Sequence, residues 1–360
     1  MPLTYGEYVH AARVALGTEI SPLCKIYLDT NFWLRLRDVR LGRNTDSEWV
    51  SMLTRLEGLV ATNQAVCPLS AETFREVFLQ NDLNTLTTTL RLIDQLSRGV
   101  CLLDPDERMH AEAYHFVRKS LKIHLSDLSP LNHTVWTRAA YVLGMIVPTH
   151  PGMDETLELE LQKAFFDEMW TRSFEDMINV LGERATQWAP RMPDMSAQMT
   201  ADKLSHVDDY SSFQQLFLIE LRGGLDSYHS CFDSIIRQMT ALAFGVIPPD
   251  QTLTNEACGE KIANIIYNCF ERGVVKRDLP TLHVLARLHA GLRWNRTRKY
   301  KDNDVADTWH ASAAIAFCDF FFTERSLCHL VSDKTIGIAS NFPCKTYFDV
   351  RVANIALECV

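Results

Sequence analysis

The sequence of 360 residues lacks the motifs that would assign it directly to a well-marked class of enzyme. No two of its ten cysteines are spaced as CxxC, so neither a zinc knuckle nor a dithiol redox motif is indicated. GxxxxGK[ST], GxSxG and HExxH are also missing, which leaves P-loop nucleotide hydrolysis, serine hydrolysis and zincin chemistry without support. No apolar run reaches the roughly 18 residues that a membrane span needs, so we expect no membrane segment.

An excess of basic charge is missing as well. The chain has 36 Lys and Arg against 45 Asp and Glu, a net charge of −9 and a pI of about 5.7. It is therefore not a generic nucleic-acid-coating protein, although a local basic patch would suffice for a small footprint. Residues 1–16 lack a basic region followed by an apolar core, so we expect no signal peptide and a cytoplasmic location. Cysteines in apolar runs, such as Cys101 and Cys318, are then expected to be reduced and buried.

What the sequence does contain is an alternation of strand and helix patterns at both ends. In the first part we predict strands over 25–29, 65–70 and 99–105, with helices over 30–37, 47–62, 70–80 and 86–96. In the last part we predict a helix over 304–318, a strand over 319–323, a short helix over 325–333 and a strand over 344–350. This alternation is typical of a parallel α/β sheet flanked by helices.

The middle of the chain has a different texture, with almost no strand signal. Aromatic and Met residues recur at helical spacing over 161–183, on what reads as one stripe, and again over 213–244, which is typical of helices packed into a core. We therefore predict three parts: residues 1–106, an all-helical insertion over 107–280, and residues 281–360. The first and last parts would form one sheet, and the insertion could cap a cleft, form a homo-oligomer or hold a protein partner.

Acidic side chains follow the predicted strands. Asp29 ends the first strand, the turn after the second supplies Glu72 and Glu76, and Glu324 follows the strand that ends at Thr323. In open α/β sheets ligands bind at the carboxyl ends of the strands, so we expect these acids to share one edge.

Three more acids open the predicted helix over 304–318 or come just before it. The spacing of Asp304 and Asp307 puts both on one helix face. Helix capping explains one such acid, because carboxylates favour a helix N-terminus. It does not explain Asp302, Asp304 and Asp307 together, since like charges this close repel unless a cation sits among them.

The order of these motifs resembles that of the PIN-domain nucleases. "YLDTN" (27–31) is similar to the family's first strand, which ends in its first catalytic Asp. "PLSAETFREV" (68–77) is similar to its second element, in which a Ser is followed six residues later by a helical Glu, here Glu76. "NDVADTWHASAAIAFCDFFFTE" (303–324) is similar to its third and fourth elements, an Asp that opens an Ala-rich helix and a strand that ends in Thr plus an acid. The family usually places an Asp or a polar residue where Arg325 stands, and the acid here comes one residue earlier.

The resemblance covers roughly residues 24–105 and 295–350, and implies a PIN-like sheet and hydrolysis of phosphodiesters that leaves 5′-phosphate and 3′-hydroxyl ends. Clustered carboxylates suit hard cations such as Mg²⁺ or Mn²⁺, which lower the pKa of a bound water. The residues implied as catalytic are Asp29, the central ligand, with Asp304, Asp307 and Glu76. Asp304 and Asp307 would be further metal ligands, and Glu76 would be a ligand or a base that orients the attacking water. Glu324 would be an outer ligand, and Asn31 and Thr323 would orient the carboxylates.

A basic segment directly precedes these acids. It contains Arg293, Arg296, Arg298, Lys299 and Lys301, with Trp294 and Tyr300 interleaved. Basic side chains neutralise phosphates and aromatic rings stack on unpaired bases, whereas the alternative is a solvated loop that balances the neighbouring acids. The resemblance favours single-stranded RNA as substrate, with single-stranded DNA as the alternative. His310 could contact a phosphate or leaving group, or could be a packing histidine.

Two functions therefore remain open from the sequence. The first is a metal-dependent nuclease, in particular an endoribonuclease. The second is a PIN-like binding or scaffold protein with a degraded site, acting through its helical insertion. The departure at Arg325 is the feature that favours the second.

Overall fold

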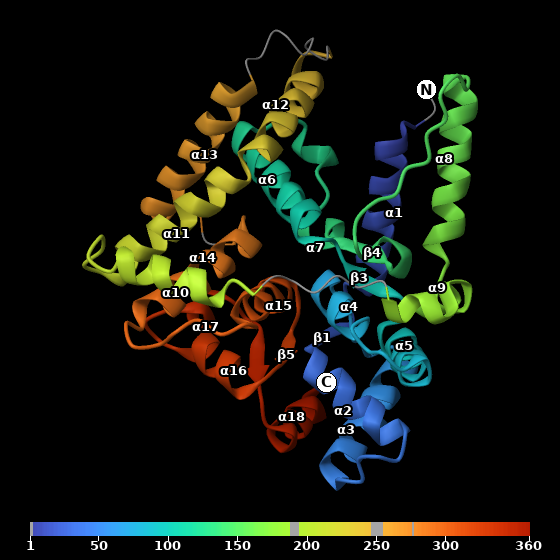
Figure 1. Cartoon of the computed structure of the whole chain (residues 1–360). Helices are drawn as coiled ribbons and strands as arrows, with labels where there is room; N and C mark the ends of the chain where they lie inside the picture. The colour runs from blue at the N-terminus through green and yellow to red at the C-terminus, as the bar shows by residue number, and fades with distance from the viewer. Residues whose placement is uncertain (1–2, 188–193, 246–254, 276) are drawn as a thin grey trace.

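The computed structural model describes residues 3–187, 194–245, 255–275 and 277–360 (Figure 1). Four parallel strands form the main sheet in the order β2 (Ala65–Val66), β1 (Cys24–Leu28), β5 (Phe320–Phe322) and β6 (Lys345–Tyr347). The register pairs Leu28 with Phe322 and Phe322 with Tyr347, so three strands end level with one another. The parallel sheet with flanking helices that the sequence predicts is present.

The helices before β3 (Val100–Leu102) confirm the predicted order of elements. They are α1 (Tyr5–Ile20), α2 (Thr30–Arg40), α3 (Ser47–Ala61), α4 (Ala71–Val77) and α5 (Leu83–Ser97). Polar residues cap the N-termini of three of these helices. The side chains of Asp29, Ser70 and Asp82 accept hydrogen bonds from backbone N–H groups in the first turns of α2, α4 and α5. The strand predicted over 65–70 is shorter than expected and ends at Val66.

The last part also follows the prediction. It contains α14 (Pro280–Trp294), α15 (Asp304–Phe317), α16 (Arg325–Ser332), α17 (Ile338–Asn341) and α18 (Val350–Ala356) around β5 and β6. Cys101 and Cys318 are buried free thiols, as expected. No helix among the described residues is both long and apolar enough to cross a lipid bilayer.

Side chains of the central strands alternate between two cores. Ile26, Leu28 and Phe322 pack into one core with α2, α3 and α5, and Tyr27 and Phe321 pack into the other with α14 and α15. Both faces of the sheet are thus covered, which explains why β1 and β5 read as continuous apolar runs. The buried alanines of α15 let that helix approach the sheet closely.

The prediction of an all-helical insertion over 107–280 is wrong at one point. β4 (Trp136–Arg138) lies inside that range and pairs antiparallel with β3. β3 in turn forms a parallel bridge from Cys101 to Leu69, three residues after β2. A strand of three residues is too short to show a period-2 pattern, so the sequence gives no signal for it.

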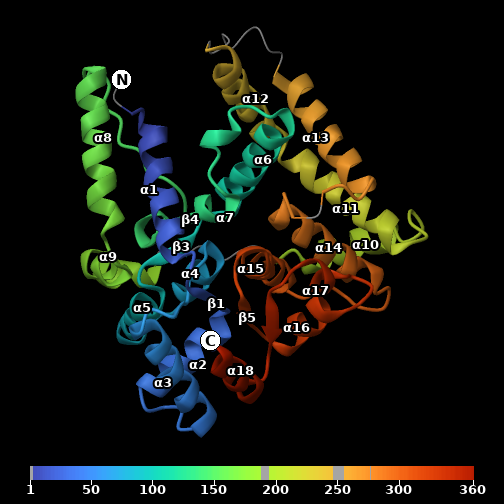
Figure 2. The same ribbon diagram turned by 180° about the vertical axis from the view of Figure 1, so that it is seen from behind.

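The middle of the chain forms two helical groups (Figures 1 and 2). α8 (Glu155–Trp170) and α9 (Phe174–Leu181) pack against α1 and α5. α11 (Phe213–Ser227), α12 (His229–Phe244) and α13 (Asn255–Glu271) pack with α6 (Pro105–Leu121) and α14, and α10 (Ser196–Ser205) lies beside them. The single stripe expected over 161–183 is broken before α9, where Ser173 forms a capping box with Asp176. Shorter helical segments lie at Leu125–Asp127, Leu131–Thr134 (α7), Ala139–Tyr141, Gly182–Gln187 and Leu357–Cys359.

The contact of α1 with α7 gives a testable prediction about stability. A Cβ at Gly17 would lie 2.2 Å from the backbone oxygen of His133, so Gly17→Ala forces two backbones apart. We expect it to lower the free energy of unfolding by roughly 1–3 kcal/mol, measured by urea denaturation. Gly58→Ala is the matched control, because nothing lies within 4 Å of that Cβ on α3 and Ala favours helix. Equal stability of the two variants would contradict the close approach.

Candidate functional site

Parallel strands bring the predicted acids to one edge of the sheet. Asp29 directly follows β1, and its backbone N–H donates to the carbonyl of Phe322 on β5 over 3.0 Å. Thr323 and Glu324 follow β5, while α4 carries Glu72 and Glu76 after the β2 segment. The first turn of α15 supplies Asp307. We call Asp29, Glu76, Asp307 and Glu324 the acid edge.

Asp29 is buried, with 6% of its surface exposed. Its carboxylate accepts from the N–H of Phe32 over 3.1 Å, which starts α2. The pKa of Asp29 is raised to about 6, chiefly by burial and in smaller part by the charge of Glu76, against the opposing effects of the Thr323 hydroxyl, His310 and the Phe32 N–H. Thr323 is nearly fully buried and lies close enough to lower the pKa of Asp29, but its hydroxyl makes no hydrogen bond of normal geometry within the described residues, so its role in orienting that carboxylate stays a prediction.

Asp307 is the second strongly affected acid. Burial raises its pKa to about 7, and the negative charges of Glu324, Asp29 and Asp304 push it the same way, against His310. The charge of Asp29 thus adds to a pKa that burial has already raised, which happens when like charges are held close together. Asp307 is therefore within electrostatic reach of Asp29, Asp304 and Glu324, and their joint role as a metal site stays a prediction.

His310 lies in the middle of this group. Its Nδ1 is 2.8 Å from the hydroxyl of Tyr27, and its Nε2 is 3.3 Å from a carboxylate oxygen of Glu76. Burial lowers the pKa of His310, but the hydrogen bond and charge of Glu76 and the charges of Glu72 and Asp29 outweigh it and raise the pKa to about 9. His310 therefore does more than fill space in the core, because its contact with Glu76 favours the protonated imidazole.

Further hydroxyl groups complete the surroundings of His310. Tyr27 is fully buried, and its hydroxyl is also 2.6 Å from Ser70 Oγ and 3.2 Å from Thr73 Oγ1. Thr30 donates to Glu76. Burial raises the pKa of Glu76, but His310 and Thr30 lower it, and the net result is a pKa below the usual value. Sequence reasoning missed Tyr27, although it stands two residues before Asp29 on the same face of β1.

The carboxylate of Glu72 is buried without a hydrogen-bond donor among the described residues. It is buried, with 7% of its surface exposed, and neither carboxylate oxygen has a hydrogen-bond partner among the described residues. A buried carboxylate is costly without a donor or a cation. The surroundings therefore favour the approach of positive charge.

Asp304 has a different role from the one predicted. It is buried, and the guanidinium of Arg298 binds both of its oxygens over 2.9 and 2.7 Å, while the N–H of Lys301 donates over 2.9 Å. Its charge is thus already compensated by a bidentate ion pair. The argument that Asp302, Asp304 and Asp307 jointly need a bound cation is wrong, because Arg298 is the cation and exposed Asp302 accepts from Ser196.

Two other predicted site residues also differ from expectation. Asn31 is exposed, and its side chain makes no hydrogen bond to a carboxylate of the described site, so it does not orient one. Glu324 is exposed and accepts from the hydroxyl of Ser326 at the start of α16. It acts on Asp307 through its charge.

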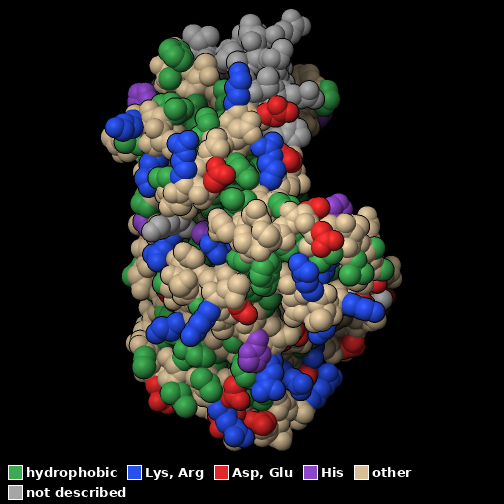
Figure 3. Space-filling model, turned by 90° about the vertical axis from the view of Figure 1, so that its left-hand side faces the viewer, with side chains coloured by type: hydrophobic (Ala, Val, Ile, Leu, Met, Phe, Trp, Pro, Cys, Tyr) green, Lys and Arg blue, Asp and Glu red, His purple; other side chains and the backbone are tan. Residues whose placement is uncertain are grey.

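The basic segment is only partly free. Arg293 pairs with Asp202 and Glu220 over 3.0 and 3.2 Å, and the Trp294 ring packs 6.1 Å from those of Tyr210 and Phe213. Three of the predicted cations are exposed and form no ion pair within the described ranges: Arg296, Lys299 and Lys301. On the side of the molecule that bears α10 and α11, Lys and Arg side chains alternate with acidic ones and form no continuous patch (Figure 3).

Helix α10 of the middle part holds this segment in place. The Lys203 ammonium is 1% exposed and donates to the carbonyls of Leu292, Asn295 and Arg298 over 2.8, 2.6 and 2.7 Å. It thereby satisfies carbonyls at the end of α14, which an α-helix leaves without partners. One job of the middle part is therefore to fix the segment that leads into α15.

Comparisons with protein-family models, curated proteins and solved structures found no match. Any function must therefore be argued from the site itself. Within the residues that the structure describes, no three His, Cys, Asp or Glu side chains lie close enough together to hold a metal ion. In the described structure the acid edge therefore does not form a preassembled set of three protein ligands around one metal position.

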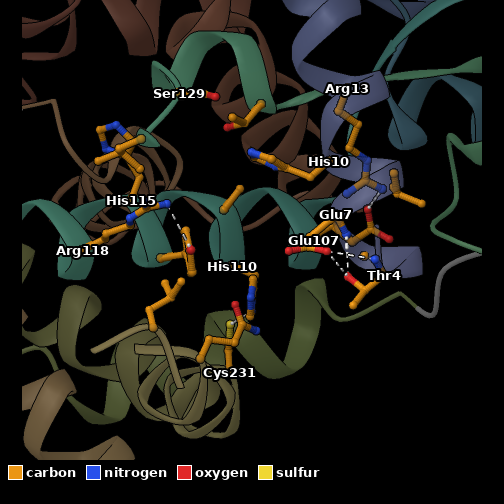
Figure 4. Close-up of a pocket in the computed structure, with 18 of the residues that line it drawn as sticks. Thr4, Glu7, His10, Arg13, Glu107, His110, His115, Arg118, Ser129 and Cys231 are labelled. Atoms are coloured by element: carbon orange, nitrogen blue, oxygen red, sulfur yellow. Dashed lines mark hydrogen bonds and ion pairs between the residues drawn. The ribbon is translucent and has the colours of Figure 1, made fainter. Parts of the chain in front are cut away.

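A large cavity lies apart from the acid edge (Figure 4). Its volume is about 1580 Å³, and it is lined by α1, α6, α12 and the segment around His124. His10, His110 and His115 face it, and Nδ1 of His110 is 3.1 Å from Sγ of Cys231. Burial lowers the pKa of these three imidazoles, so they are neutral at pH 7. No acid-edge residue lines this cavity.

Proposed function

We propose that this protein is a divalent-metal-dependent nuclease that hydrolyses phosphodiester bonds of single-stranded RNA at the acid edge. The observation that carries the proposal is the placement of the acids: the level ends of β1 and β5 bring Asp29 and Glu324 to one edge of the sheet, and Asp307 lies in the first turn of α15. Burial and neighbouring acids raise the pKa of both Asp29 and Asp307, which supports it. A buried site with surplus negative charge favours a bound cation. Carboxylate oxygens are the ligands that Mg²⁺ and Mn²⁺ prefer.

The donor set fits such an ion without a closed cage. Mg²⁺ keeps several waters and usually takes one or two protein carboxylates together with substrate phosphate oxygens. Asp29 and Asp307 would hold the ion, with Glu324 at its outer side. When bound, the ion supplies a water of lowered pKa and stabilises negative charge on the phosphodiester.

The chain's own groups supply orientation and substrate binding. Thr30 and His310 hold the Glu76 carboxylate in one position, where it would orient the attacking water. The exposed Arg296, Lys299 and Lys301 would contact phosphates of a strand that approaches the start of α15. This footprint is small, as an acidic chain requires.

A second candidate is the binding or scaffold protein with a degraded site. The observation that favours it is the His310 cation, which already offsets part of the negative charge of Glu76, Glu72 and Asp29. In that case the helices α10 to α13 would be the working surface.

Metal titration separates the two candidates. At pH 8 we expect Mn²⁺ to raise the unfolding temperature, because binding to the folded state at about 100 times its Kd adds about 2.7 kcal/mol. Asp307→Asn should lose most of this shift, and single-stranded RNA should be cut only with metal present. The scaffold function would replace the proposal if millimolar Mn²⁺ neither stabilises the protein nor supports cleavage.

A further inference from the structure

An exposed aromatic side chain lies beside the acid edge. Phe348 directly follows β6, and 36% of its surface is exposed. The guanidinium carbon of Arg325 lies 5.1 Å from the centre of this ring. The ring of His329 lies 5.7 Å away from it, at an interplanar angle of 35°. An exposed Phe in contact with two side chains of α16 is not explained by the packing of the core.

The position of Phe348 relates it to the acids. The N–H of Thr323 donates to the carbonyl of Tyr347 over 2.9 Å, so Phe348 leaves the sheet at the same edge as Thr323. β6 is two strands from β1, which corresponds to about 10 Å at the usual strand spacing. A strand of nucleic acid held at Asp29 therefore has its neighbouring nucleotides within reach of Phe348.

The chemistry of the group suits an unpaired base. Aromatic rings and guanidinium planes both stack on nucleobases, and every base has a face for this. Arg325 is exposed and has no ion pair among the described residues, so its charge is available to a phosphate.

We propose that Phe348, with Arg325 and His329 against its ring, stacks on an unpaired nucleobase of the strand held at the acid edge. This inference rests on the proposed function in taking single-stranded RNA as the ligand. It adds the group that favours a single strand, because the bases of a duplex are stacked on one another and do not offer a free face.

The test is binding of fluorescein-labelled poly-uridine RNA to the full chain in EDTA, followed by fluorescence anisotropy, so that cleavage does not interfere. We expect Phe348→Ala to weaken binding about tenfold, and Phe348→Trp to retain it, because a larger ring still stacks. Val352→Ala, at an exposed apolar position on the next helix, is the matched control and should bind like the wild type. Arg325→Gln should lower the slope of log K against log salt by about 0.7.

The stacking site would be overturned by equal affinity of Phe348→Ala and wild type, by loss of binding in Phe348→Trp with a normal thermal unfolding curve, or by no measurable binding of single-stranded RNA by the wild type. The site would also be overturned if Phe348→Ala weakened binding of a blunt RNA duplex as much as it weakens binding of single-stranded RNA. A failure of the nuclease proposal can be distinguished from a failure of the stacking site. If Phe348-dependent binding is found but Mn²⁺ supports no cleavage, the stacking site stands and the catalytic function does not.

Discussion

Asp29→Asn and Asp307→Asn should each reduce cleavage of single-stranded RNA in Mn²⁺ by about 100-fold or more, measured as the initial rate on a labelled oligonucleotide. Each substitution removes a carboxylate that would hold the metal and replaces it by a neutral group of the same size. The amide oxygen that Asp29→Asn introduces can still accept the N–H of Phe32, so the start of α2 is kept.

Stability measurements show whether a loss of cleavage in these two variants is due to loss of the catalytic group and not to unfolding. Both aspartates are destabilised by burial and by neighbouring acids, so the two amide variants should be at least as stable as the wild type above pH 7 without metal. Asp302→Asn is the control, because Asp302 is exposed in the same segment and accepts a hydrogen bond from Ser196. Undiminished cleavage by both active-site variants would show that these residues are not the metal ligands.

That Asp29 and Thr323 lie at one edge of the sheet could be predicted, because strand ends and parallel topology can be inferred from the sequence pattern. An apolar run that ends in Asp29 predicts a strand and its carboxyl end, and parallel topology then brings Thr323 to the same edge. The helical spacing from Asp307 to His310 also places the imidazole on the face of Asp307. What spacing does not reveal is the protonation of His310, which depends on Glu76 from α4, a helix more than two hundred residues earlier in the chain.

Ion pairing inside the basic segment could not be predicted for a related reason. Composition shows basic side chains beside three acids, but the partner of each depends on the path of an irregular loop. Arg298 binds Asp304 through its side chain, while its carbonyl accepts from Lys203 of the distant helix α10. The same holds for the middle part, whose two helical groups are defined by packing partners and not by a change in hydrophobic pattern.

The free energy of unfolding of the metal-free protein should fall as pH rises from about 6.5 to 9. Glu112 on α6 is fully buried, and both of its oxygens accept from the N–H of Thr281 over 3.1 and 3.0 Å. Burial raises its pKa from 4.5 to about 8, against the opposing effects of Thr281 and Arg108. The folded state therefore binds a proton that the unfolded state releases above pH 4.5, and this stabilisation is lost as pH rises toward 8. The contribution is on the order of 4 kcal/mol.

Three other groups act in the same direction, whereas the histidines of lowered pKa, His10, His110, His115 and His289, oppose them only below pH 6.5. Asp29 and Asp307, with pKa values near 6 and 7, also hold protons more tightly when folded, and lose this stabilisation as they ionise. The pKa of His310 is raised to about 9, so its contribution is complete below pH 6.5 and disappears as pH rises through 9. All four contributions therefore decrease with rising pH, and none compensates another.

Glu112→Gln isolates the largest of these contributions. The amide oxygen of Gln can accept the N–H of Thr281 but carries no charge at any pH, so the variant should lose less stability than the wild type between pH 5 and 9 in urea denaturation series. Glu160→Gln, at an exposed position on α8, should follow the wild-type curve. Parallel curves for Glu112→Gln and wild type would mean that Glu112 is ionised in the folded state, and that Arg108 compensates its charge within the core.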